Sequence, residues 1–121
     1  MDIYRQNLMD NYKNPQNFGD LLDANAIIVL ENTNCGDKVK MQLKIENEVI
    51  SDVKFDGEGC AVSIASASIL TEHIKGKKVS EVEQMSLEDL LDLIGVQLTV
   101  SRLKCANLGL EATKKALSEH K

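Results

Sequence analysis

Two stretches with alternating apolar and polar residues most constrain how this chain can fold. Apolar side chains occupy every second position in residues 38–45, and the same period returns in residues 49–55. A period of two places successive side chains on opposite faces of a β-strand. Asn47 supplies a tight turn between the two stretches. With the β-branched run Ala-Ile-Ile-Val-Leu at 26–30, they predict a three-stranded antiparallel sheet.

Helical patterns flank the predicted strands. Residues 3–12 indicate a short polar helix, which the turn-forming residues of 14–19 end. After Cys60, the run 61–70 is rich in Ala and Ser, and small side chains let a helix pack its backbone close to a sheet. The final stretch, from about Thr99 onward, has a wide apolar arc and predicts a well-buried helix.

Two short sequences have the pattern of helix starts. In 80–83 and 86–89 an acidic residue follows a serine by three positions, which is the spacing of a capping box. We therefore predict helices that start at Ser80 and Ser86, the second ending at Gly95. The whole pattern predicts an α+β fold, with a three-stranded antiparallel sheet covered on one face by helices.

Length and composition narrow the class of protein. The chain has 121 residues, 43% of them apolar, which fits a single domain over 1–121. It contains no apolar run of membrane-spanning length and no signal-peptide pattern, so we expect a cytoplasmic protein without a membrane partner. A net charge of −5 and few aromatic residues provide neither a basic surface nor a stacking platform, so we expect no nucleic-acid partner.

Three cysteines, Cys35, Cys60 and Cys105, carry the functional signal. Their odd number and wide spacing argue against a disulfide framework. Cys35 is followed by glycine and then Asp37, and a glycine turn lets two ligands two residues apart face one centre. Cys60 follows a flexible Gly-rich approach, 57–59, and lies at a predicted helix start, where the helix dipole favours the thiolate.

Cys105 taken alone fits a small packing residue on the last helix, because free cysteine is among the most buried residue types. The three cysteines together favour a site, since each lies near the end of a predicted element and all can meet Asp37 at one end of the sheet. Three soft ligands and one hard ligand hold a metal or an iron–sulfur cluster less firmly than four thiolates, which suits transfer.

Four motifs in this order resemble those of the IscU/SufU/NifU-N family of iron–sulfur cluster assembly scaffolds. They are Cys35-Gly36-Asp37, the Gly-rich approach with its small-residue helix at 57–68, Gly76-Lys77-Lys78, and residues 102–108. The segment 12–19 is also similar to the N-terminal part of that family. The resemblance covers nearly the whole chain and implies the α+β fold of IscU and SufU.

The resemblance implies a scaffold that receives persulfide sulfur from a pyridoxal-phosphate-dependent cysteine desulfurase. The scaffold combines this sulfur with iron into a transient [2Fe–2S] cluster and passes the cluster to apo iron–sulfur proteins. It implies Cys35, Asp37, Cys60 and Cys105 as ligands of the cluster, of iron or of zinc. Cys35 and Cys105 are the candidate persulfide acceptors, since a thiolate attacks a persulfide by the exchange that reshuffles disulfides.

Two features leave a second function open. Many IscU proteins have a histidine directly before the third cysteine, whereas this chain has Lys104, which resembles the SufU branch of zinc-dependent sulfurtransferases. SufU proteins typically carry an insertion between the Gly-Lys motif and the last helix, and here the segment 76–99 is short, as in IscU. We expect a scaffold without enzymatic activity, with a zinc-dependent persulfide relay as the alternative. The oligomeric state stays open.

Overall fold

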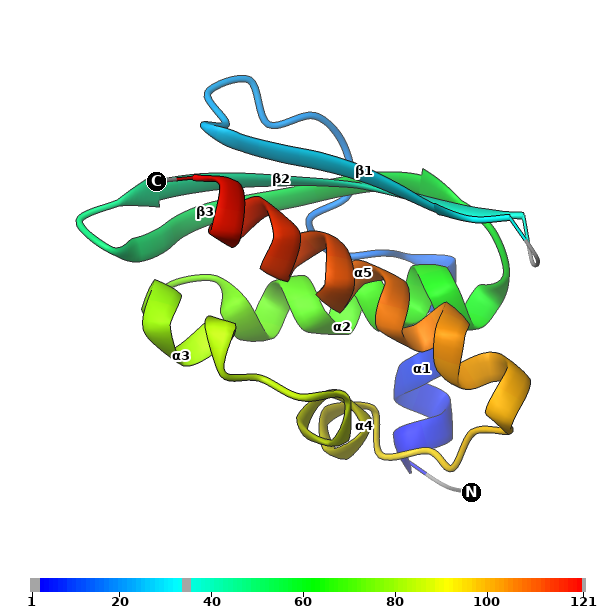
Figure 1. Ribbon diagram of the computed structural model, residues 1–121. Coiled ribbons are helices and arrows are strands. Elements are labelled where there is room, and N and C mark those ends of the chain that lie inside the picture. Colours follow the sequence, from blue (N-terminus) through cyan, green and yellow to red (C-terminus); the bar gives the residue numbers. More distant parts are fainter. Residues whose placement is uncertain (1–2, 34–35, 121) are drawn as a thin grey trace.

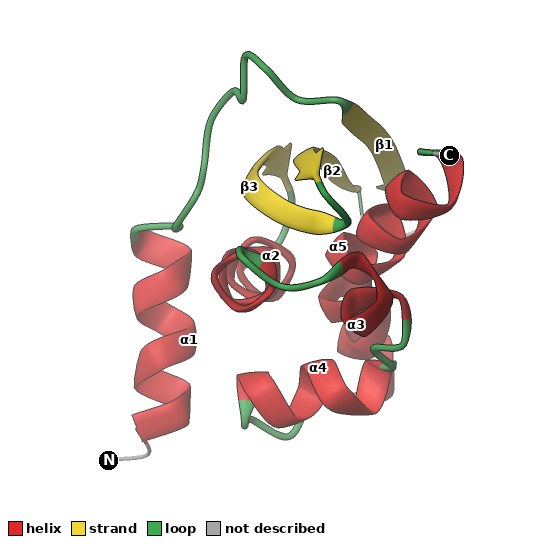
Figure 2. Ribbon diagram, turned by 90° about the vertical axis from the view of Figure 1, so that its left-hand side faces the viewer, coloured by secondary structure: helices red, strands yellow, loops and turns green. Residues whose placement is uncertain are grey.

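The computed structural model describes residues 3–33 and 36–120 (Figure 1). In chain order the elements are α1 (Ile3–Lys13), β1 (Ala26–Asn32), β2 (Asp37–Glu46), β3 (Val49–Glu58), α2 (Ala61–Ile74), α3 (Val79–Glu83), α4 (Leu87–Ile94) and α5 (Val100–Glu119). The strands form one antiparallel sheet in the order β1-β2-β3. The helices lie on one side of it, with α2 and α5 next to the sheet and α1 beside α2 (Figure 2). The predicted α+β fold is confirmed.

Alternation along β2 separates the two faces of the sheet as predicted. Val39, Met41 and Leu43 are fully buried and contact the helical layer. On the opposite face, Gln42 is buried as well, because the chain segment before β1 covers it. Its side-chain amide accepts a hydrogen bond from Leu21 N (2.9 Å) and donates one to Gly19 O (2.9 Å). Both polar atoms of the buried amide therefore have a hydrogen-bond partner, as a polar group without water requires.

Short chain segments pair with the outer edge of β3. The segment 17–19 exchanges two backbone hydrogen bonds with Phe55, each 2.9 Å long. Further along, the segment 76–79 makes three backbone hydrogen bonds of 2.7–2.9 Å with residues 48–50. Both segments lack the alternation of a strand, so the sequence indicated only turns there.

The predicted helix start at Ser80 is wrong. Helix α3 begins one residue earlier, at Val79, with Lys78 as its N-cap and no side-chain hydrogen bond at the cap. Val79 N donates to Glu48 O at 2.9 Å, so the turn between β2 and β3 satisfies an amide at the start of this helix. This pairing joins residues distant in the sequence, and a local capping pattern does not report it.

Helix α4 has complete caps at both ends, as its sequence predicted. At its start, Ser86 Oγ accepts from Asp89 N (3.2 Å) and Asp89 Oδ2 accepts from Ser86 N (2.9 Å), a capping box. At its end, Gly95 has φ 71° and donates its N–H to Leu91 O at 2.8 Å. A side chain on Gly95 would overlap the ring of Tyr4, so this residue serves both the left-handed turn and the docking of α1.

The small residues of α2 were predicted to bring its backbone close to the sheet, and the close approach that they allow in the structure is to α5. A Cβ placed on Gly109 of α5 would lie 3.4 Å from the Cβ of Ala67, a van der Waals contact that leaves no room for a larger side chain. The apolar arc predicted for the last helix is buried except for the partly exposed Leu103. No helix in the described ranges is long and apolar enough to cross a membrane.

Candidate metal centre

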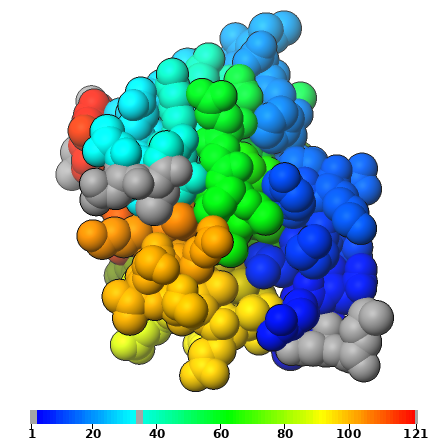
Figure 3. Space-filling model, turned by 90° about the vertical axis from the view of Figure 1, so that its right-hand side faces the viewer, coloured from blue at the N-terminus to red at the C-terminus, as the bar shows by residue number. Residues whose placement is uncertain are grey.

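Three of the four predicted site residues come together at one end of the molecule. Asp37 is the first residue of β2, Cys60 is the N-cap of α2, and Cys105 lies in the second turn of α5. A carboxylate oxygen of Asp37 and the two sulfur atoms all lie within 4.8 Å of one another. Figure 3 views this end, where the green surface of the β3–α2 junction borders the cyan surface of β2 and the orange surface of early α5.

The two carboxylate oxygens of Asp37 differ in their hydrogen bonding. The residue is 1% exposed, and its Oδ1 accepts a hydrogen bond from Cys60 N at 2.9 Å. Its Oδ2 is buried and has no hydrogen-bond partner among the described residues. A buried carboxylate oxygen without a partner costs free energy, which a bound cation would offset. Two sulfurs and one such oxygen form a donor set that suits zinc or iron.

Gly59 is required for this approach between Asp37 and Cys60. Its φ is 154°, a conformation that side-chain-bearing residues rarely adopt, and a Cβ there would overlap the Asp37 carboxylate. The segment before it is not the flexible approach that the sequence indicated. Gly57 belongs to β3 and pairs with Val39, so the chain enters the site from an ordered strand.

The two described cysteines differ in accessibility. Cys60 is half-buried and its side chain makes no capping hydrogen bond, although it occupies the N-cap position of α2. Cys105 is 2% exposed, and its thiol donates a hydrogen bond to Ser101 O at 3.8 Å. The interpretation of Cys105 as a packing residue is therefore correct for its burial, while its sulfur also belongs to the cluster of potential ligands.

Cys35 lies outside the described residues, and its place in the ligand set stays a prediction. The described residues on either side of it are Thr33, just after β1, and Gly36, just before β2. Gly36 N donates to Asn32 O at 2.9 Å, and Gly36 has φ 73°. β1 ends at Asn32 and β2 starts at Asp37, and these two residues pair across the sheet.

Sequence reasoning missed the bond between Cys60 N and Asp37, because the direction of a backbone amide cannot be read from a motif. A signal for it was present in Gly59, since a glycine directly before a helix N-cap allows another group to approach the backbone closely. Lys104, directly before Cys105 on α5, is exposed.

Comparison with known proteins identifies relatives on both branches. Zinc-dependent sulfurtransferase SufU of Bacillus subtilis (strain 168) is 37% identical over 134 aligned positions, covering 97% of this chain and 90% of the relative. Iron–sulfur cluster assembly scaffold protein IscU of Aquifex aeolicus (strain VF5) is 36% identical over 119 positions, covering 97% and 75%.

A solved structure has the same fold. The N-terminal part of a nitrogen-fixing NifU-like protein from Brucella abortus matches with a TM-score of 0.82 and covers 98% of this chain and 94% of that chain. At 18% sequence identity this similarity supports the fold alone. The family described as NifU-like N terminal domain matches residues 3–121, and the chain therefore belongs to this family of IscU and SufU homologues.

Proposed function

We propose that this protein is a scaffold on which a [2Fe–2S] cluster is assembled and from which it is passed to apo iron–sulfur proteins. The observation that carries the proposal is the buried, unpartnered Oδ2 of Asp37 beside the thiols of Cys60 and Cys105. A carboxylate among thiolates is the hard, more easily displaced ligand of the set. A site with one weak ligand can open a coordination position, and a scaffold that must release its cargo needs this.

The chain's own residues supply ligands and a sulfur acceptor. Cys35, Cys60 and Cys105 as thiolates, with Asp37, hold the iron of the cargo. For sulfur delivery, the thiolate of Cys35 or Cys105 attacks the outer sulfur of a persulfide on a cysteine desulfurase. A new sulfur–sulfur bond forms on the scaffold, and the desulfurase cysteine leaves as a thiolate. Cys105 is 2% exposed, so attack by this residue requires the site to open.

The alternative function is a zinc-dependent relay of persulfide sulfur, which Lys104 and the similarity to SufU favour. The lengths of the two alignments favour the scaffold. The alignment to SufU has 134 positions and the chain has 121 residues, so at least 13 positions lie opposite gaps in this chain. The alignment to IscU has only 119 positions. The chain therefore lacks a length of sequence that the SufU relative has.

Metal content and colour after anaerobic purification test the proposal. A scaffold, incubated with iron, cysteine and a cysteine desulfurase, should gain visible absorption, iron and acid-labile sulfide in equal amounts, and should pass the cluster to an apo-ferredoxin. A colourless protein that keeps one zinc per chain, forms no cluster and accelerates the desulfurase would establish the relay instead.

A further inference from the structure

The two edges of the sheet differ in how far their backbone groups are hydrogen-bonded. On the β3 edge, the segments 17–19 and 76–79 make four backbone hydrogen bonds with the strand and a fifth with Glu48 just before it. On the β1 edge, within the described part of the chain, residues 27–31 have no backbone hydrogen bonds except those to β2. Only the beginning of this edge is closed, where His120 Nδ1 lies 3.3 Å from Asn25 O. The remaining edge has outward amide and carbonyl groups available for pairing.

The sequence of β1 has few of the features that protect an exposed edge. The strand contains no proline, lysine or arginine between Ala26 and Asn32. The side chains of Ile27 and Val29 on its outer face are 50% and 48% exposed. Natural edge strands usually carry such charges, prolines or bulges, because a bare edge pairs with other chains. The β1 edge is therefore suited to receive a further strand.

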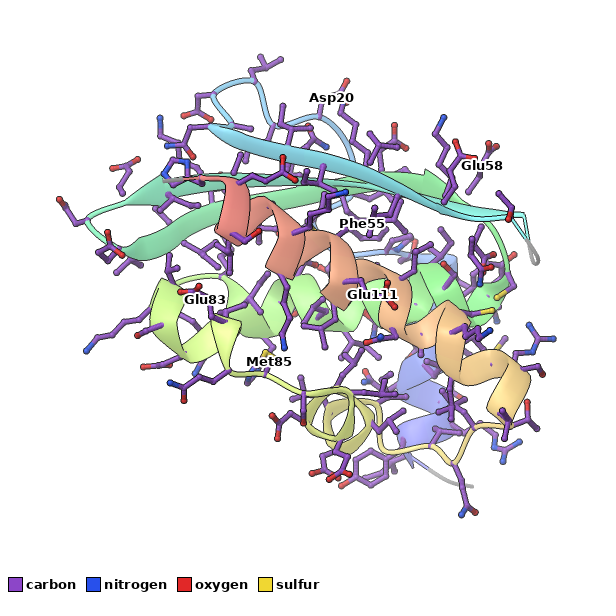
Figure 4. The ribbon with its side chains drawn as sticks, viewed as in Figure 1. Asp20, Phe55, Glu58, Glu83, Met85 and Glu111 are labelled. Atoms are coloured by element: carbon purple, nitrogen blue, oxygen red, sulfur yellow. The ribbon has the colours of Figure 1, made fainter. Side chains whose placement is uncertain are left out.

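A hollow of about 290 Å³ lies between the second half of β1 and the first half of α5. It is lined by Glu31, Asn32, Thr33, Lys104, Leu108 and Glu111. Figure 4 shows Glu111 on the side of α5 that faces the viewer, below β1. A strand edge next to a helix is the arrangement in which extended peptides bind by β-augmentation: the backbone provides affinity and the helix contacts alternate side chains.

Charge and position indicate which kind of segment fits. The hollow has two carboxylates, Glu31 and Glu111, against one ammonium, Lys104, and the chain has a net charge of −5. The ion pair of Glu31 with Lys38 is 4.0 Å long and roughly half exposed, so it competes only weakly for a new cation. The hollow lies next to the site, because its lining residue Asn32 pairs with Asp37 across the β1–β2 ladder and Lys104 adjoins Cys105.

We propose that residues 29–33 bind an extended segment of a partner protein as a fourth strand, with one basic side chain of that segment near Glu31 on the outer face of the sheet and the next near Glu111 on the helical side. Because the added strand ends beside the candidate metal centre, the partner is an apo-protein that accepts the cluster. That assignment of the partner rests on the proposed scaffold function, whereas the binding of a basic extended segment does not.

The test uses the zinc-loaded full chain and a synthetic acetylated, amidated peptide, Thr-Lys-Lys-Val-Thr, whose adjacent lysines lie on opposite faces of a strand, followed by amide chemical shifts in low salt. We expect the shifts to change at residues 27–33 and 104–111. Glu31→Lys should weaken binding at least fivefold. The matched control is Glu83→Lys, the same charge reversal at an exposed residue of α3 (Figure 4). A peptide with N-methyl groups on alternate amides, or with glutamate in place of lysine, should not bind measurably.

Three outcomes would overturn the proposal. These are equal binding of the N-methylated peptide, shift changes confined to another surface, and concentration-dependent changes at 27–33 without peptide, which would assign the edge to a second copy of this chain. Cluster assembly is measured on the same Glu31→Lys preparation. Normal assembly with lost peptide binding separates the edge from the scaffold function, and failed assembly in the unaltered protein with intact peptide binding rejects only the scaffold.

Discussion

Helices α4 and α2 begin in opposite ways. At the start of α4, Ser86 and Asp89 satisfy each other's backbone amides, and both side chains are used by the helix. At the start of α2, Cys60 makes no side-chain cap, and Asp37 accepts the Cys60 amide with only one of its oxygens. The first arrangement stabilises the helix as far as local groups can. The arrangement at α2 leaves the Cys60 thiol and Asp37 Oδ2 available as metal ligands, and it lies in the candidate site.

The largest expected effect comes from giving α2 the cap that α4 has. In Cys60→Ser, a hydroxyl can accept an amide of the first turn, so the metal-free protein should be more stable by ~1 kcal/mol. The same change removes a soft ligand, so zinc affinity should fall on the order of 100-fold or more, beyond the loss of an outer-shell partner. Zinc competition against a chromophoric chelator and urea unfolding of the chelated protein measure the two effects. Unchanged zinc affinity would remove Cys60 from the ligand set.

The second effect concerns the C-terminal cap of α4, Gly95. Gly95→Ala should destabilise the protein by about 2 kcal/mol, from the left-handed backbone and the overlap with the Tyr4 ring. Gly76 is the matched control, because its φ is 85° and a Cβ there meets nothing within 4 Å. Gly76→Ala should therefore cost only the backbone contribution, about 1 kcal/mol. Equal losses in urea unfolding would show that the Tyr4 contact contributes nothing.

The third effect tests the uncommitted oxygen at the start of α2. If Asp37 is the displaceable ligand, Asp37→Ala should leave cluster assembly intact and slow transfer to an apo-ferredoxin about tenfold, which corresponds to about 1.4 kcal/mol in the barrier. The absorbance of the loaded scaffold should also decay more slowly. Unchanged rates of both processes would mean that the carboxylate does not control release, and would favour the zinc-dependent relay.

The smallest effect isolates the capping box. Ser86→Ala should destabilise the protein by ~1 kcal/mol and leave zinc affinity unchanged, because the residue lies outside the candidate site. Ser80→Ala is its control, since Ser80 is exposed and its helix starts one residue earlier without a side-chain cap. That variant should stay within about 0.5 kcal/mol of the parent. A loss in Ser80→Ala equal to that in Ser86→Ala would contradict the assignment of the caps.

Features that depend on neighbouring residues were predictable from the sequence. The alternation around Met41 predicted the buried face of the sheet, and the Ser86 pattern predicted a capping box that the structure contains. The start of α3 was not predictable in this way. It depends on the bond from Val79 to Glu48, and the pairing of distant segments leaves no mark in a short sequence window.

The candidate site was predictable to the level of residue identity and not to the level of orientation. Asp37, Cys60 and Cys105 lie together as their positions at element ends predicted. Cys35 remains a prediction, and so does the role of all four residues as ligands. Which oxygen of Asp37 is engaged by the backbone depends on how β2 enters the sheet relative to α2. A motif identifies the possible ligand groups, whereas the fold determines which of them are already used in hydrogen bonds.

The contact between Gly109 and Ala67 has a consequence for how defects in this protein should be read. Ala67 lies seven residues after Cys60 on one helix and Gly109 four residues after Cys105 on the other, about 10 Å and 6 Å along the two axes. The helix that follows Cys60 and the helix that carries Cys105 therefore pack closely at a point where neither has a large side chain. A methyl group at Gly109 would just reach Ala67, whereas a larger side chain there would overpack the contact and separate α2 from α5. A variant can therefore lose metal with every ligand residue present, because the distance between α2 and α5 has changed.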